Sequence, residues 1–77
     1  MTQRQAEELI RMYARTGRHY KLHPDIAEID VRYAALPNPS IDKTMRWLGF
    51  CQGYLVREGI FSLDDVKLHS QQTIGGS

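Results

Sequence analysis

The sequence has few features that stabilise small domains by covalent or metal bonds. Its 77 residues include a single cysteine, Cys51, so no disulfide can form within the chain. The motif His-Glu-x-x-His is absent, and His19, His23 and His69 do not have the spacing of a metal site. We therefore expect no metal ion and no cofactor. Because a domain this small buries a modest fraction of its surface, self-association or contact with a partner protein is the remaining source of stability.

Long apolar runs and a strong charge imbalance are also missing. No apolar run approaches the length of a membrane-spanning helix, and the N-terminus is polar from Thr2 onward, unlike a signal peptide. We therefore expect no membrane partner, and a lone cysteine is compatible with a reducing cytoplasm. A net charge of +1 favours neither a strongly basic nucleic-acid binder nor an acidic nucleic-acid mimic. The sequence also has no glycine-rich phosphate loop and no paired nucleophile and base, so we expect no enzyme.

The residues that are present predict an all-α fold of three or four helices in one domain. Thr2 and Gln5 have the spacing of a capping box, and the apolar periodicity that follows predicts a helix over residues 3–16 with Gly17 as its C-terminal cap. Pro24 is suited to the first turn of a second helix over 24–36. Residues 28–34 also alternate like a strand, and this alternative stays open.

Two further helices are predicted in the second half of the chain. One begins at Ser40 or Asp42 and runs to about residue 58, where Gly59 ends it. Ser62 to Asp65 has the pattern of a second capping box, which begins a short helix through about His69. The domain then covers residues 1–70, and the polar, glycine-rich segment 71–77 is expected to be a flexible tail.

The helix over 40–58 is apolar over about two thirds of its circumference, more than one neighbouring helix can cover. Two interpretations follow. The helix is central, with the others wrapped around it, or the face near Trp47, Phe50 and Tyr54 is covered by another molecule, either a second copy or a target protein. Gly49 and Gly53 share one face and weaken the helix, so we expect close packing of another helix there.

Basic residues gather on one face of the first predicted helix, opposite its apolar stripe. They are Arg4, Arg11, Arg15 and Arg18, with Lys21 beyond them. Such a face predicts contact with an anion, either an acidic protein surface or nucleic-acid phosphate. The alternative is a solvated face with ion pairs between successive turns.

The segment from Arg46 onward, RWLGFCQGYLVREGIFSLDDVKLH, resembles a pattern in the C-terminal halves of small uncharacterised proteins of tailed bacteriophages and prophages. The matching residues are Trp47, Leu48, Gly49, Phe50, Gln52, Gly53, Gly59, Ile60, Phe61, Ser62, Leu63, Asp64, Asp65, Lys67 and His69. The match covers about a third of the chain. The resemblance implies a phage-encoded accessory protein in the bacterial host cytoplasm that binds and modulates or inhibits a host protein, including one of antiviral defence.

The leading hypothesis is therefore a non-catalytic, homo-oligomeric protein that binds a host protein. Its predicted contact residues are the aromatic side of the helix over 40–58 and the arginine face of the helix over 3–16. The runner-up is a small nucleic-acid or nucleotide binder that uses the arginine face. A structural subunit of the virion is a third hypothesis.

Overall fold

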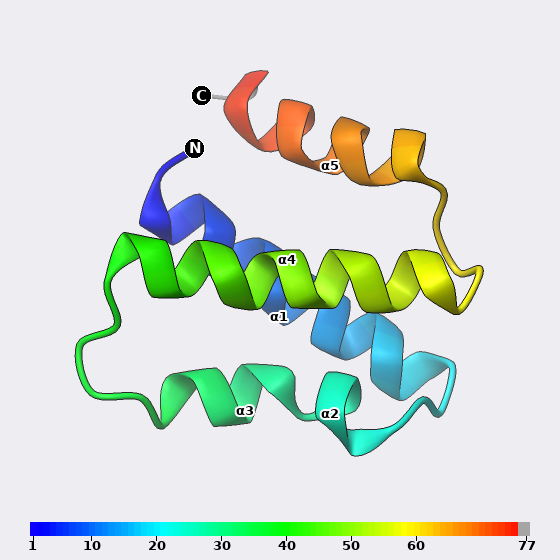
Figure 1. Ribbon diagram of the computed structural model, residues 1–77, viewed down its shortest axis with the longest axis horizontal. Coiled ribbons are helices and arrows are strands. Elements are labelled where there is room, and N and C mark those ends of the chain that lie inside the picture. Colours follow the sequence, from blue (N-terminus) through cyan, green and yellow to red (C-terminus); the bar gives the residue numbers. More distant parts are fainter. Residues whose placement is uncertain (76–77) are drawn as a thin grey trace.

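Helix α1 is the element against which every other helix packs. A computed structural model describes residues 1–75 of the chain, with side chains through Gln71. The helices are α1 (Gln3–His19), α2 (Pro24–Ala27), α3 (Ile29–Ala34), α4 (Ile41–Arg57) and α5 (Leu63–Gly75). In Figure 1, α1 runs diagonally behind α4, with α2 and α3 on one side and α5 on the other, and α1 contacts all four. The all-α prediction is confirmed for the described residues, while the central position belongs to α1 and not to α4.

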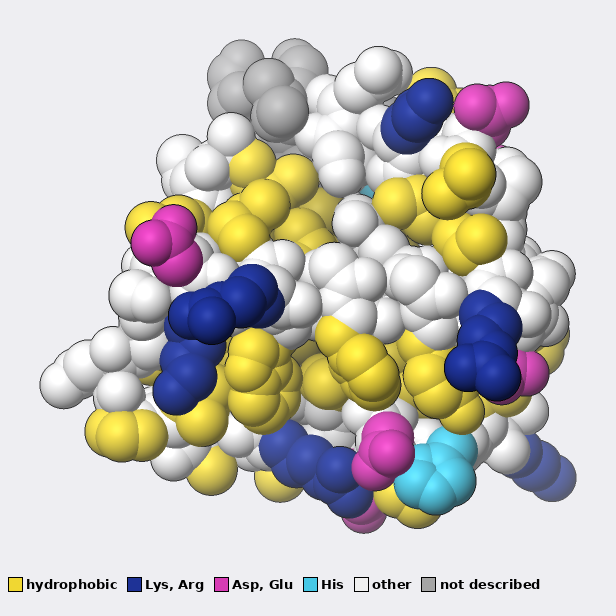
Figure 2. Space-filling view, in the orientation of Figure 1, with side chains coloured by type: hydrophobic (Ala, Val, Ile, Leu, Met, Phe, Trp, Pro, Cys, Tyr) yellow, Lys and Arg dark blue, Asp and Glu magenta, His cyan; other side chains and the backbone are white. Residues whose placement is uncertain are grey.

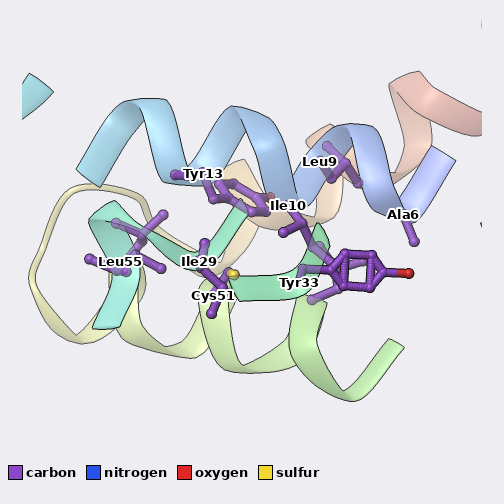
Figure 3. Packing of buried hydrophobic residues seen from close by; sticks show 11 residues of the cluster. Ala6, Leu9, Ile10, Tyr13, Ile29, Tyr33, Cys51 and Leu55 are labelled. Carbon is purple, nitrogen blue, oxygen red and sulfur yellow. The ribbon is translucent and has the colours of Figure 1, made fainter. Parts of the chain in front are cut away.

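The molecule is only two helices thick. The Cα atoms extend 29 × 28 × 16 Å, and one helix with its side chains is about 10 Å across. The buried stripe of α1 consists of Ala6, Leu9, Ile10, Tyr13, Ala14 and Gly17, and that of α4 consists of Thr44, Leu48, Cys51 and Leu55. Figure 3 shows Ile10 and Tyr13 of α1 facing Cys51 and Leu55 of α4, with Ile29 and Tyr33 of α3 beside them. Because no third layer is present among the described residues, the outer side of α4 has no helix over it.

The predicted helix starts are confirmed, since each depends on side chains close in sequence. The Thr2 hydroxyl accepts a hydrogen bond from the backbone N–H of Gln5 at 3.2 Å, and the Gln5 side chain accepts one from the N–H of Thr2 at 2.8 Å. Ser40 is the N-cap of α4. Before α5, the N–H of Ser62 donates to the Asp65 carboxylate and the N–H of Asp65 donates to the Ser62 hydroxyl, both at 3.0 Å. These contacts satisfy N–H groups that have no partner in the first turn of a helix.

The predicted end of α4 is also confirmed. Gly59 has a φ of +75°, in the left-handed region that favours glycine. Its N–H donates to the carbonyl of Val56, and the N–H of Ile60 donates to the carbonyl of Leu55, both at 3.0 Å. This pair of bonds is a Schellman motif, which turns the chain toward α5.

The predicted end of α1 at Gly17 is wrong, because Gly17 is used for packing. A Cβ atom at this position would lie 3.1 Å from the Cα and N atoms of Ala27 and 3.1 Å from the Ile26 side chain. The helix continues to His19, and Lys21 takes the left-handed conformation instead, with a φ of 54°. Glycine at position 17 is therefore explained by the close approach of α1 and α2, not by the end of a helix.

The single helix predicted over 24–36 is instead two short helices that meet at Glu28. In a continuous helix the N–H of Val31 would donate to the carbonyl of Ala27. Here the Arg18 guanidinium donates to that carbonyl at 2.8 Å, and the N–H of Val31 donates to the Asp30 carboxylate at 2.9 Å. Arg18 and Asp30 also pair with each other at 3.1 Å. A residue of α1 thus interrupts the helix, and the alternative of a strand over 28–34 is not adopted.

Helix α5 runs to Gly75, beyond the predicted end near His69. The predicted tail 71–77 is therefore helical as far as Gly75, and residues 76 and 77 lie outside the described residues.

A small polar network joins α1, α3 and α4 at one end of the core. The hydroxyl groups of Tyr33 and Thr44 are 2.5 Å apart, and Tyr33 also donates to the Glu7 carboxylate at 2.8 Å. Thr44 is fully buried, and its hydroxyl oxygen also lies 2.9 Å from the carbonyl oxygen of Ser40. Because buried polar groups without partners are costly, this network favours one register of α4 on α1.

We predict opposite effects of alanine at two glycines in the interior of long helices. Gly17→Ala should lower the free energy of unfolding by about 1–3 kcal/mol, because the new methyl group meets the backbone of α2. Gly53→Ala should raise it by up to about 1 kcal/mol, because nothing lies within 4 Å of its Cβ position and alanine is the better helix former. Urea unfolding measures both. A Gly17→Ala protein at least as stable as the parent chain contradicts the close contact between α1 and α2.

Candidate protein-binding surface

Helix α4 has an inner face that builds the core and an outer face that does not. Its buried residues, Thr44, Leu48, Cys51 and Leu55, recur every three or four positions and point toward α1. The exposed residues of the opposite face include Arg46, Gly49, Phe50, Gly53 and Arg57. The outer face therefore carries an aromatic ring that the fold does not bury. We call these five exposed residues, together with Trp47 and Tyr54 at their edge, the α4 surface.

The three aromatic residues predicted as contacts differ in their surroundings. Phe50 is 46% exposed. Trp47 and Tyr54 are partly buried and pack against the core. The ring of Trp47 lies 5.8 Å from that of Tyr33, and the rings of Phe50 and Tyr54 are 5.9 Å apart. Phe50 is consequently the residue of the three with the most surface left for a partner.

Two hollows lie on either side of Phe50. One, of about 280 Å³, is lined by Asp25, Ile29, Arg32, Arg46, Trp47 and Phe50. The other, of about 340 Å³, is lined by Gly49, Phe50, Gly53, Tyr54 and Arg57. Figure 2 shows a row of hydrophobic side chains across this side of the molecule, with basic side chains beside both ends of the row. Aromatic and arginine side chains around a shallow apolar groove are the composition typical of protein interfaces.

Gly49 and Gly53 do not pack closely against another helix within the described chain. No atom lies within 4 Å of the Cβ position of either residue. The missing side chains keep one hollow open beside Phe50. Close packing at these glycines thus stays a prediction about a second molecule.

Arg46 and Arg57 have no carboxylate partner within residues 1–71. Arg32, by contrast, pairs with Asp25 at 3.0 Å and with Glu28 at 3.6 Å. The positive charge of the α4 surface is therefore uncompensated at both ends.

The arginine face of α1 is exposed, and one of its residues, Arg18, also has a structural role. Arg18 bonds the Ala27 carbonyl and the Asp30 carboxylate. Partial burial acts to raise the pKa of Asp30, but the hydrogen bonds from Arg18 and from the N–H of Val31 outweigh it and hold that pKa below its usual value. Arg18 therefore stabilises the junction of α2 and α3.

The other basic residues predicted for this face lie exposed on the surface. Arg4 is 3.8 Å from Glu8, one turn along the helix. Arg11 and Arg15 are exposed and have no ion pair within residues 1–71, and Lys21 lies beyond the end of α1. Arg18 thus has partners within the fold, Arg11 and Arg15 have no ion pair within residues 1–71, and binding at this face stays a prediction.

A polar cluster around Tyr13 was not predicted from the sequence. Tyr13 is fully buried on α1, and its hydroxyl lies 2.9 Å from Nδ1 of His69 and 3.4 Å from the amide of Gln52. Phe61 packs edge-on against the His69 ring at 4.8 Å. Burial raises the pKa of Tyr13. The cluster attaches α5 to α1 and α4, and the signal for it was a tyrosine in a buried stripe, whose hydroxyl needs a partner.

Cys51 is a buried apolar residue, as its position in the helix predicts. Its side chain is fully buried, and burial raises the pKa of the thiol from 9.0 to about 12. Because the thiolate is the reactive form, this cysteine is poorly suited to act as a nucleophile.

The raised pKa of Cys51 predicts a loss of stability in alkali. Above its ordinary pKa the thiol loses its proton in the unfolded chain but keeps it in the folded chain, so unfolding releases a proton and stability falls as pH rises. We expect Cys51 to lower the free energy of unfolding by on the order of 2 kcal/mol between about pH 8 and about pH 11. The pKa of Tyr13 is raised by burial and acts in the same direction.

Urea unfolding across this pH range measures the effect, with Cys51→Ala as the matched variant. In Cys51→Ala the free energy of unfolding should fall less steeply as pH rises, and the fall that remains should include the contribution of Tyr13. Equal declines for the two proteins would contradict the release of a proton from Cys51 on unfolding.

Comparisons with known proteins do not assign this surface to a family. The chain matches no protein family, and no curated protein or solved structure matches it. Within the described residues, no helix is both long and apolar enough to cross a membrane, and no three His, Cys, Asp or Glu side chains come together as a metal site. The α4 surface and the sequence resemblance of the segment that builds it are therefore the features that bear on function.

Proposed function

We propose that this chain is a non-catalytic accessory protein of a phage or prophage that binds a bacterial host protein through the α4 surface and modulates or inhibits it in the host cytoplasm. The observation that supports this most directly is Phe50, an aromatic residue that is 46% exposed between two hollows on a helix whose other face builds the core. Full burial of an exposed phenylalanine is worth about 1.5–3 kcal/mol, and Phe50 has about half of its surface left to cover, so a partner gains on the order of 1 kcal/mol from the ring.

The resemblance to phage proteins includes residues for which the fold has no use. Many matching positions have a role inside the molecule, among them Leu48 in the core, Gly59 at the end of α4, and His69 in the Tyr13 cluster. Gly49 and Gly53 make no close contact, and Phe50 is exposed. A shared partner-binding surface accounts for these three positions, because the fold would be at least as stable with alanine at the two glycines.

The nucleic-acid hypothesis loses part of its basis. Arg18 is committed to Ala27 and Asp30, and Arg4 lies beside Glu8. Arg11, Arg15 and Lys21 remain as exposed cations, and three cations supply few of the phosphate contacts on which such binding depends. We therefore assign the partner contact to the α4 surface.

The test is affinity capture from a bacterial host lysate with the parent chain and two serine variants. Phe50→Ser should reduce the amount of the captured host protein by tenfold or more, on the order expected for loss of a central aromatic contact. Leu68→Ser is the matched control, because Leu68 is 50% exposed on α5, away from the α4 surface. It should capture as the parent chain does.

Quantitative mass spectrometry measures the amount of each host protein that the parent chain and the two variants capture. Phe50 is a better choice than Trp47, whose replacement would also remove packing against Tyr33. Capture that is equal for the parent chain and Phe50→Ser contradicts the proposal. Capture that disappears after nuclease treatment supports the nucleic-acid hypothesis instead.

A further inference from the structure

The charges of the α4 surface follow a pattern that limits what can cover it. Arg46 and Arg57 are eleven residues apart in α4. At 1.5 Å per residue and 100° per residue, they are about 16 Å apart along the helix and within about 20° of each other around it. Gly49, Phe50 and Gly53 lie between them on the same side. The surface is thus an apolar strip with one arginine at each end.

Each arginine belongs to a different hollow. Arg46 lines the hollow with Ile29 and Trp47, and Arg57 lines the hollow with Gly53 and Tyr54. Asp25 is the acidic residue that lines the first hollow, and it is already paired with Arg32 at 3.0 Å. No acidic residue lines the second hollow. An occupant must therefore bring its own negative charge to both ends.

A second copy of this chain does not satisfy this requirement through the same surface. Arg46 and Arg57 are nearly equidistant from the midpoint between Gly49 and Gly53. Antiparallel packing of two α4 helices centred on the glycines would therefore place Arg46 of one copy opposite Arg57 of the other. Parallel packing would place each arginine beside its counterpart. Like charges held together in this way destabilise a complex, so the surface disfavours its own copy.

We propose that the occupant is an acidic amphipathic helix of the partner protein, laid along α4. Its apolar side chains would cover Phe50 and fill the two hollows, and carboxylates about three turns apart would pair with Arg46 and Arg57. Gly49 and Gly53 would let its backbone approach closely, which is the geometry of helix-in-groove recognition. This inference rests on the proposed function and adds the chemistry of the partner.

A protein helix fits the surface better than nucleic acid does. Phosphates along a nucleic-acid strand follow one another at intervals much shorter than the distance between the two arginines, and their binding depends on many cations. Between Arg46 and Arg57 the surface offers an aromatic ring and two glycines, with no further cation.

The test is selection from a displayed library of random helical peptides, carried out in parallel on two forms of the full chain. The parent chain should enrich peptides with Leu, Met or Phe between Asp or Glu residues that have the spacing of Arg46 and Arg57. The variant Arg46→Glu/Arg57→Glu should enrich Lys or Arg at the same positions. The matched control, Arg11→Glu/Arg15→Glu, has the same change in net charge and should enrich acidic peptides as the parent chain does.

The affinity of the best acidic peptide for each variant then measures how much the two charge pairs contribute to binding. Two exposed charge pairs contribute about tenfold in affinity, so the charge-reversed variant should bind this peptide at least about tenfold more weakly. Replacement of its two acids by glutamine should weaken binding to the parent chain by a similar factor. Phe50→Ser should also weaken it.

Three results would overturn the inference. The first is a selection that yields no Phe50-dependent peptide, or peptides whose charge does not change with the variant. The second is a dimer in sedimentation that Phe50→Ser dissociates, because the occupant is then a second copy. The third is displacement of the selected peptide by duplex DNA at the concentration at which the DNA binds. Host-protein capture that depends on Phe50 while the selection fails would leave the proposed function standing without this partner chemistry.

Discussion

The contact between α1 and α4 is the constraint on which the rest of the molecule depends. One stripe of α1, which includes Ile10 and Tyr13, covers one stripe of α4, which includes Cys51 and Leu55 (Figure 3). The short helices α2 and α3 and helix α5 complete the core from the sides, where they also contact α1 (Figure 1). Because the chain supplies no element for the far side of α4 within the described residues, the apolar residues of that helix divide into a buried set and an uncovered set.

The helix boundaries set by neighbouring residues could be predicted, and those set by distant residues could not. Thr2 with Gln5, Ser62 with Asp65, and the left-handed Gly59 all act within one helical turn, so their pattern in the sequence is sufficient. Gly17 has the composition of a helix end but lies against Ala27, ten positions away. The same applies to the break at Glu28, which requires the Arg18 side chain to reach the second helix.

The candidate surface was predictable as an excess of apolar area but not as a particular set of residues. A helical wheel shows that α4 is apolar on too many sides, yet it does not say which side the rest of the chain covers. Trp47 and Tyr54 proved to be partly buried because α3 and the core lie beside them, and Phe50 did not. The arginine face of α1 was predicted from angles alone, and the pairing of Arg18 with Asp30 could not be, because it depends on the fold that brings α3 within reach. The Tyr13 cluster depends on α5 folding back over α1, which no local pattern signals.

The most direct test of the two-faced α4 is a solvent-accessibility measurement by NMR on the free protein, with a soluble paramagnetic complex that broadens the signals of exposed groups. The amide signals of Gly49, Phe50 and Gly53 should be broadened strongly, and those of Leu48, Cys51 and Leu55 should be broadened little. Addition of the captured host protein should protect Gly49, Phe50 and Gly53, so their amide signals should become sharp again. Equal protection of both sets in the dilute free protein would mean that the outer side of α4 is already covered, and it would contradict the account.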